Sequence, residues 1–338
     1  MNVMTRSKAT DQKADGGERS RSADVRTALL ERYGGVLVLV GLILLFGILK
    51  PDAFLTYNNI VGILANSAIL GILAAGLLAP LAAGVFDISI GGAMTLAIVA
   101  VTYLFQVTGG DMPVPVAILI VLLGAVALGM INAALVVRQG VDPFIATIGT
   151  GSVMVGMSQL LANGTTITDG IPKAFTDFGR AQVDKISIAV FILAGLCLFA
   201  WYILDYTPFG RNLYATGASR EATRLAGIRT GRVITIAFIC SALGAAIAGI
   251  VFAGRLGTGP PGIGAGFLIG AYSAAFLGST IIRPGRFNVP GLIVALLIIG
   301  VGINGLQLVG LPFWVVETFQ GAALLAAVLI ARRRPAVI

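Results

Sequence analysis

Ten mostly apolar stretches recur along the chain, and they constrain its fold more than any other feature. A helix needs about 20 predominantly apolar residues to cross the hydrocarbon core of a membrane. The stretches lie at residues 34–49, 59–82, 89–107, 114–137, 143–162, 186–204, 233–253, 263–280, 288–308 and 313–331. The sequence therefore predicts an all-α, polytopic membrane protein with about ten transmembrane helices, in a membrane domain at 34–331.

The amino-acid composition and the turn-forming residues between the stretches agree with this prediction. The chain is 57% hydrophobic and only 11% charged, with a mean hydropathy of +0.96, whereas soluble domains are about 25% charged. Turn-forming residues separate several of the apolar stretches, where a helix is expected to stop. These are Lys50-Pro51-Asp52, Gly109-Gly110-Asp111, Asp142-Pro143 and Gly259-Pro260-Pro261.

The residue types that are missing disfavour whole classes of function. The chain has no histidine, and its two cysteines, Cys197 and Cys240, lie inside apolar stretches, so neither a metal site nor a disulfide framework is expected. No glycine is followed by lysine, which excludes the usual ATP-binding loop. A membrane enzyme is disfavoured because no nucleophile and base cluster together. The chain is therefore not expected to hydrolyse ATP itself.

Basic residues predict the orientation. Residues 1–33 are polar and are expected to form a disordered tail. With this tail inside, eighteen of the 23 Lys and Arg residues fall on the inner side, and only Lys50, Lys173, Arg180, Lys185 and Arg255 fall outside. The positive-inside rule therefore predicts that both termini are cytoplasmic. The same rule explains the net charge of +8 better than nucleic-acid binding does.

Polar and charged residues within a span cost free energy, so each of them is a candidate for a structural or functional role. Asp87 and Ser89 follow a break in the apolar run near Pro80. They belong either to a broken-helix element that lines a pathway or to a short cytoplasmic turn that caps the next helix. Glu317 lies one turn into the last span. There it can reach water, accept a hydrogen bond from a neighbouring helix, or line a pathway.

Two segments suggest an internal repeat. Met130-Ile131-Asn132-Ala133 resembles Gly302-Ile303-Asn304-Gly305, and each is followed by Pro-Phe at the start of the next span. Five spans separate the two matches, so the hypothesis is an inverted repeat of two five-helix halves, with chance similarity as the alternative. Asn132, Asn304 and Gln307 can bind a hydroxylated solute, although links between helices are the default expectation.

Small residues recur every four positions in the eighth span, where they allow another helix to approach closely. Intramolecular packing is favoured over a dimer interface. These residues are Gly262, Gly266, Gly270, Ala274 and Gly278.

The longest inner loop, 205–232, is predicted to carry a short surface helix. Ser219 is a suitable N-cap, Glu221 lies in the first turn and Gly227 can end the helix. The helix presents Glu221, Arg224 and Leu225 to the cytoplasm, which is typical of a docking site for a soluble partner.

This loop resembles the coupling segment of permease subunits from bacterial ATP-binding cassette importers of the ribose and simple-sugar type. Their pattern is F-G-R, a gap, A-x-G and E-A-A-R-L-(S/A)-G-I. The chain has Phe209-Gly210-Arg211, Ala215-Thr216-Gly217 and Glu221-Ala222-Thr223-Arg224-Leu225-Ala226-Gly227-Ile228. Three further segments match the family's D-L-S-V-G, P-F-I-x-T-L-G-T and N-G-L motifs: 87–91, 143–150 and 304–306.

The resemblance implies partners and site residues. It implies two permease subunits that form the pathway, cytoplasmic ATPase subunits that bind ATP and magnesium, and an extracytoplasmic sugar-binding protein, in the bacterial cytoplasmic membrane. The chain itself is then not an enzyme and holds no cofactor. The expected ATPase-coupling residues are Ser219, Arg220, Glu221, Ala222, Arg224, Leu225, Gly227 and Ile228. The expected pathway residues are Asp87, Ser89, Asn132, Phe144, Asn304 and Gln307.

The expected function is therefore import of a monosaccharide, such as a ribose-like sugar or polyol, by alternating access. The chain departs from the family pattern at 266–271, where many sugar permeases carry an acidic G-Y-E-L-D-A segment, so the solute is expected to differ from ribose. A permease of the same architecture for branched-chain amino acids or nucleosides is one alternative. An ion-coupled secondary transporter is another, although it would need a buried acidic relay.

Overall fold

The computed structural model describes residues 33–332, so the tail predicted at residues 1–33 lies outside the described part except for Tyr33. Within that part, seven helices are long and apolar enough to cross a membrane: Tyr57–Ala82, Ile90–Val107, Val114–Arg138, Pro143–Leu161, Ile188–Tyr206, Thr230–Leu256 and Val289–Val309. Three shorter apolar helices are Tyr33–Leu49, Ile263–Ser279 and Trp314–Ile330. The ten helices occupy the ten predicted stretches, which confirms the all-α, polytopic fold.

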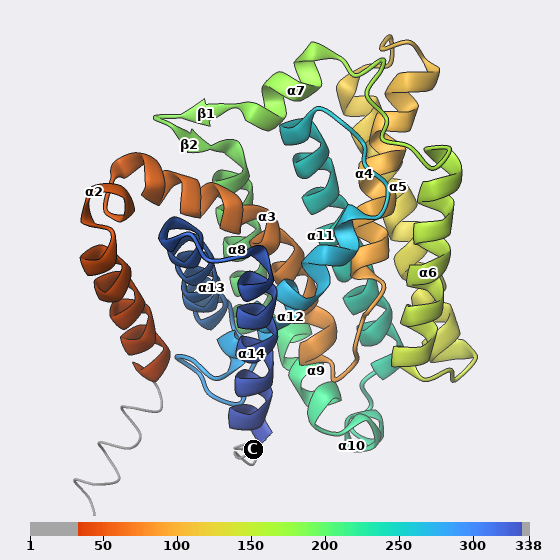
Figure 1. Ribbon diagram of the computed structural model, residues 1–338. Coiled ribbons are helices and arrows are strands. Elements are labelled where there is room, and N and C mark those ends of the chain that lie inside the picture. The colour runs from red at the N-terminus through yellow and green to blue at the C-terminus, as the bar shows by residue number, and fades with distance from the viewer. Residues whose placement is uncertain (1–32, 333–338) are drawn as a thin grey trace, which may run out of the picture.

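The elements follow the chain in a simple order (Figure 1). After the helix at Tyr33–Leu49 they are α2 (Pro51–Phe54), α3 (Tyr57–Ala82), α4 (Ile90–Val107), α5 (Val114–Ala133), the π-helix η1 (Ala134–Arg138), α6 (Pro143–Leu161), α7 (Lys173–Arg180), β1 (Gln182–Val183), β2 (Ile186–Ser187), α8 (Ile188–Tyr206), α9 (Pro208–Ala218), α10 (Arg220–Leu225), α11 (Thr230–Leu256), the 3₁₀ helix η2 (Ile263–Phe267), α12 (Leu268–Ser279), α13 (Val289–Val309) and α14 (Phe313–Arg332). The two strands form a small antiparallel hairpin.

The molecule has two distinct ends, which we name after the short helices that they carry. The α7 end holds α2, α7 and the hairpin, and the α10 end holds α9, α10 and the last turn of α14 (Figure 1). The five basic residues that the sequence assigned to one side of the membrane all lie at the α7 end. The basic residues of the other group that the structure describes, such as Arg224 and Arg286, lie at the α10 end.

The two longest helices, α3 and α11, form the centre of the bundle. In the most apolar 18-residue part of each helix, 72% of α3 and 67% of α11 is buried, compared with 17% for α8. Their backbones touch, because a Cβ atom on Gly244 of α11 would lie 2.7 Å from the Cα atom of Gly76 in α3. The outer sides of α5, α6 and α8 carry exposed large apolar residues, as expected for surfaces that face lipid or another subunit.

The eighth span differs from the prediction. A continuous helix was expected at 263–280, but the structure has a 3₁₀ helix, η2, followed by a 12-residue α-helix, α12. Five glycines and two prolines lie between Gly257 and Gly266, and these residues disfavour an α-helix. Since α12 is only about 18 Å long, the chain crosses the remaining thickness in an irregular conformation.

The small-residue stripe of this span is divided by the same break. In α12, a Cβ atom on Gly270 would touch Leu70 and one on Gly278 would touch Leu292, so this half packs inside the chain as predicted. A Cβ atom on Gly266 would meet nothing within 4 Å. The half of the stripe before α12 is therefore loosely packed, since a Cβ atom on Gly262 would meet only Gln159 Nε2, at 3.9 Å.

The long inner loop contains more helix than expected. Only its second half was predicted to be helical, and α10 confirms that prediction, with Ser219 Oγ accepting a hydrogen bond from Ala222 N at 3.3 Å and Gly227 in the left-handed conformation. The first half is also helical, as α9. Its cap is Thr207, whose hydroxyl accepts from Gly210 N, a signal that sequence analysis missed.

The geometry of the two asparagine segments is compatible with an inverted repeat. Asn132 lies near the last turn of α5 at the α10 end, and Asn304 lies near the last turn of α13 at the α7 end. An inverted repeat requires such opposite placement. The repeat itself stays a prediction.

Candidate functional site

A buried turn at residues 83–89 gathers three of the predicted pathway residues. Asp87 is 1% exposed, and its Oδ1 atom accepts hydrogen bonds from Ser89 N at 3.0 Å and Ser89 Oγ at 2.5 Å. Asn132 Nδ2 donates to Ser89 Oγ at 2.8 Å, and Thr150 Oγ1 donates to Asn132 Oδ1 at 2.6 Å. One chain of hydrogen bonds thus joins the turn to α5 and α6.

Two neighbouring helices hold the backbone of the same turn. The Tyr272 hydroxyl on α12 accepts from Asp87 N at 3.0 Å, and Thr147 Oγ1 on α6 accepts from Ile88 N at 3.0 Å. Sequence analysis did not single out Tyr272, Thr147 or Thr150, although both threonines lie in the matched motif at 143–150. Hydroxyl groups in an otherwise apolar span were the available signal.

The two interpretations of Asp87 can now be set against its geometry. The hydrogen bond that Asp87 Oδ1 accepts from Ser89 N, just before α4, is typical of a helix cap. However, Asp87 and Ser89 are both buried in the bundle, whereas Gly84 and Phe86 of the same turn are exposed. Asp87 Oδ2 and Ser241 Oγ are both buried and neither has a hydrogen-bond partner. Any direct role of Asp87, Ser89 or Asn132 in the pathway stays a prediction.

We expect Asp87→Ala to destabilise the fold by about 2 kcal/mol, because the buried donors of Ser89 lose their acceptor. Asp87→Asn should cost less, since an amide oxygen can still accept at the Oδ1 position. Thermal unfolding of the purified protein in detergent measures both. Equal losses for the two variants would show that the carboxylate charge matters, rather than the acceptor.

The other predicted pathway residues lie elsewhere. Asn304 and Asn59 exchange two hydrogen bonds, at 3.0 Å and 2.9 Å, which link α13 to α3 near the α7 end. Gln307 lines a small cavity of about 80 Å³ beside this pair. Phe144, in the first turn of α6, is 52% exposed at the α10 end. The six predicted residues therefore form a cluster of three, the pair Asn304 and Gln307 beside one small cavity, and the isolated Phe144.

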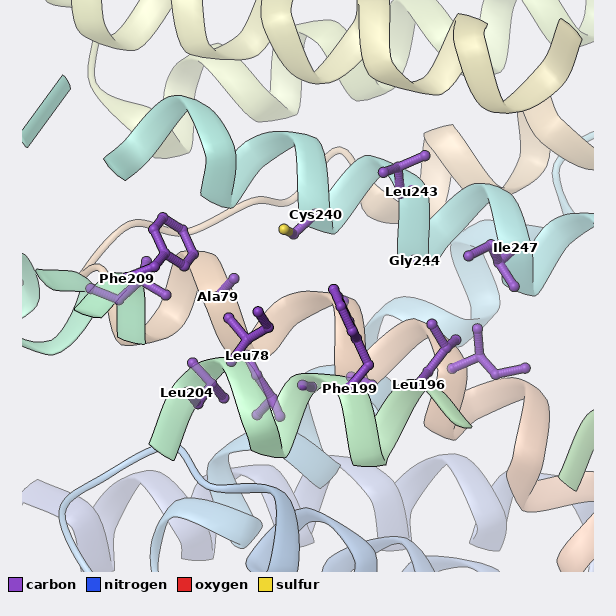
Figure 2. A pocket seen from close by; sticks show the side chains of 16 residues that line it. Leu78, Ala79, Leu196, Phe199, Leu204, Phe209, Cys240, Leu243, Gly244 and Ile247 are labelled. Atoms are coloured by element: carbon purple, nitrogen blue, oxygen red, sulfur yellow. The ribbon is translucent and has the colours of Figure 1, made fainter. Parts of the chain in front are cut away.

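One cavity with an almost entirely apolar lining is a poor site for a hydroxylated solute. It encloses about 280 Å³ between α3, α8, α9 and α11, and Figure 2 shows its aliphatic and aromatic lining, with the Cys240 sulfur as the one side-chain heteroatom. A sugar needs several hydrogen-bond partners to replace its water. Among residues 33–332, no three His, Cys, Asp or Glu side chains gather to hold a metal ion either.

The predicted coupling residues are brought together on and around α10. Glu221, Arg224 and Leu225 are all exposed, and Leu225 is 80% exposed. Thr223 faces inward and its hydroxyl donates to Ala215 O at 2.7 Å, which fixes α10 on α9. An open hollow of about 370 Å³ lies between α10 and η1. Arg220, Glu221 and Arg224 line it together with Val136, Val137, Thr230 and Gly231.

Helix α9 is tied to the loop between α12 and α13. Tyr214 Oη donates to Phe287 O at 2.6 Å, and the Arg286 guanidinium lies 3.9 Å from the centre of the Tyr214 ring. Burial raises the pKa of Tyr214, so its hydroxyl stays protonated as a donor at neutral pH. Arg283 and Asp205 form an ion pair at 2.6 Å. Movement of α9 is therefore expected to reach this loop.

Comparison with known proteins identifies the family. The family model described as "Branched-chain amino acid transport system / permease component" matches residues 59–328. The chain belongs to this permease family. Relatives include the autoinducer 2 import system permease protein LsrD of Salmonella paratyphi A, 31% identical over 88% of this chain and 91% of that protein. The D-allose transport system permease protein AlsC of Escherichia coli is 32% identical over 89% and 92%. No solved structure matches the chain.

Proposed function

We propose that this chain is the transmembrane subunit of an ATP-driven importer for a monosaccharide or a similar polyhydroxylated solute. The observation that carries the proposal is the similarity to the D-allose and autoinducer 2 permeases, which extends over about nine tenths of both chains. Since the match includes nearly the whole membrane region, a shared mode of transport is the simplest explanation.

In this proposal α10 is the contact for a cytoplasmic ATPase subunit. Its exposed leucine and charged residues, its capped ends and its position between α9 and α11 suit a rigid docking element. An exposed apolar side chain beside charged ones is typical of the surfaces that bind other proteins. ATP and magnesium would be bound by that subunit, and an extracytoplasmic binding protein would deliver the solute at the α7 end.

The orientation follows from the same assignment. We place the α10 end and both termini in the cytoplasm and the chain in a bacterial inner membrane. The distribution of basic residues supports this orientation, because most of them lie in the segments at the α10 end.

Import of a branched-chain amino acid is the second candidate, since the family description names that substrate class. A zwitterion needs charged partners or helix ends within the membrane. Among residues whose side chains the structure describes, Asp87 is the only buried charged one, so no buried basic side chain can pair with the carboxylate of an amino acid. This observation favours an uncharged, hydroxylated solute.

Uptake of labelled D-allose, D-ribose, polyols and leucine in cells with and without the gene tests the proposal. We expect loss of uptake of one hydroxylated solute, and the same loss when the ATPase subunit carries a disabled nucleotide site. Uptake that persists without ATP hydrolysis but stops when the ion gradient is dissipated would establish a secondary transporter instead. Loss of leucine uptake alone would establish the amino-acid alternative.

A further inference from the structure

The irregular segment before α12 lies at the middle of the bundle. Gly264 N donates to Thr95 Oγ1 at 3.1 Å, and a Cβ atom on Gly91 would lie 3.2 Å from the Cα atom of Ala265, so η2 packs on the first turns of α4. A Cβ atom on Gly92, in the same turn of α4, would collide with the carbonyl oxygen of Gly151. Gly151 is halfway along α6. The 3₁₀ helix therefore lies near the midplane of the membrane.

Lipid cannot cover such a segment. Irregular backbone at membrane depth is found only where protein buries it or where it lines a water-filled space. A five-residue 3₁₀ helix leaves most of its terminal N–H and C=O groups without partners inside the helix. Yet Ile263, Ala265 and Gly266 are exposed. In Figure 1 the segment that joins α11 to α12 crosses the face of the molecule nearest the viewer.

One strip of the exposed side of α6 carries small and polar residues, beside large apolar ones such as Val153 and Leu160. Ser152, Gly156 and Gln159 are exposed and are spaced four and three residues apart, so they share one face of the helix. A Cβ atom on Gly262 would lie 3.9 Å from Gln159 Nε2, so this face borders the segment before η2. The outer face of α5 differs, because it exposes large aliphatic residues such as Leu123.

The turn that joins α3 to α4 carries an exposed aromatic side chain, and this turn contacts both α6 and α12. Phe86 is 44% exposed, and its ring stacks on Tyr272 and Phe276, with centroid distances of 6.4 Å and 6.2 Å. The turn that carries Phe86 is held by α12 on one side and α6 on the other. Aromatic faces pack well against the C–H faces of a sugar ring, whose hydroxyl groups need polar partners around its edge.

We propose that Phe86, Ser152, Gln159 and residues 262–266, together called the η2 face, form the wall along which the solute crosses the membrane. Gln159, Ser152 and the open backbone of η2 would exchange hydrogen bonds with the solute hydroxyls, and Phe86 would stack against its ring. A second permease subunit would close the opposite side. This inference rests on the proposed function, since it names the surface that the imported solute touches.

A continuous line of contacts joins the η2 face to the coupling helices. Phe86 stacks on Phe276, and Phe276 meets Phe287 edge-on at a centroid distance of 5.4 Å. The carbonyl oxygen of Phe287 accepts the hydrogen bond of Tyr214 on α9. A shift of α9 and α10 would thus be transmitted to Phe86 through three side chains, which is what alternating access requires of a pathway residue.

Thiol labelling tests this placement in membrane vesicles that contain the whole transporter with its partner subunits. Single-cysteine variants Ser152→Cys and Gln159→Cys are made in a Cys197→Ala, Cys240→Ala background and treated with a charged, membrane-impermeant methanethiosulfonate. Leu123→Cys on α5 and Leu198→Cys on α8, both more than half exposed, are the matched controls. Only a hydrated thiol ionises and reacts, so we expect labelling at 152 and 159 to be more than about tenfold faster than at the controls.

Several outcomes would overturn the proposal. Equal, slow labelling at all four positions would mean that the η2 face is covered by lipid or by a dry contact with another subunit. If two copies also cross-link through Gln159→Cys while the reagent has no access, the cover is a second subunit. Uptake measured in the same vesicles separates this failure from that of the proposed function. Sugar uptake without labelling refutes the η2 face alone, whereas labelling without uptake of any tested sugar refutes only the solute class.

The aromatic contact has its own test. We expect Phe86→Ala to raise the KM for uptake of the transported sugar about tenfold, whereas Phe86→Tyr should keep it within about twofold, because about 1.4 kcal/mol of stacking is lost only in the first variant. A purely structural role for Phe86 would lower the amount of folded protein and the maximal rate, and would leave KM unchanged.

Discussion

The double variant Glu221→Arg, Leu225→Asp is expected to abolish both uptake and co-purification of the ATPase subunit. Both side chains are exposed on α10 and make no buried contact within the chain, so the fold should tolerate the change. An apolar anchor at the centre of a protein interface is worth about 2 kcal/mol, which corresponds to about a thirtyfold loss of affinity. The reversed charge adds repulsion to that loss.

The measurement is the amount of ATPase retained on a tagged permease, together with uptake by cells. Gln139→Ala provides the control, because this residue is also exposed at the α10 end but lies outside α10. We expect the control to match the unaltered protein in both readouts. Intact co-purification of the ATPase with the double variant would contradict the assignment of α10 as the docking helix.

Hydropathy predicted the fold well because the membrane imposes one simple requirement on each span. All ten apolar stretches are helical, and the short helix α10 begins and ends at the predicted cap residues. The prediction of the eighth span was wrong in detail, because hydropathy does not distinguish a continuous helix from η2 followed by α12. The glycines and prolines at 257–266 carried that information, since they disfavour the helix while keeping the segment apolar.

The candidate site was harder to predict, because it depends on which helices are neighbours. Asp87, Ser89 and Asn132 were singled out as costly polar residues, and the structure brings them into one hydrogen-bonded cluster. Phe86 and Gln159 were not singled out, since an aromatic or amide side chain in a span is unremarkable until the fold shows it exposed. Exposure at membrane depth is a property of the packed bundle rather than of any sequence window.

The second large effect is expected for Gly92→Leu, which should prevent α4 from packing on α6. The two helices approach so closely that a Cβ atom at position 92 would overlap the carbonyl oxygen of Gly151, and a Cβ atom at position 151 would lie 3.1 Å from the Cα atom of Ser89. Backbone atoms cannot move aside as a flexible side chain can. Overpacking of this kind costs about 3 kcal/mol or more, so we expect little folded protein after extraction in detergent.

Gly124→Leu is the matched control, because Gly124 also lies within a span but a Cβ atom there would meet nothing within 4 Å. Thermal unfolding followed by size-exclusion chromatography should show a normal midpoint for Gly124→Leu and a strongly lowered one for Gly92→Leu. The α4–α6 contact positions both Ser89 and the exposed face of α6, so its loss should also displace the η2 face. A Gly92→Leu protein with normal stability would mean that α4 and α6 are further apart than described, and the midplane position of η2 would then lose its support.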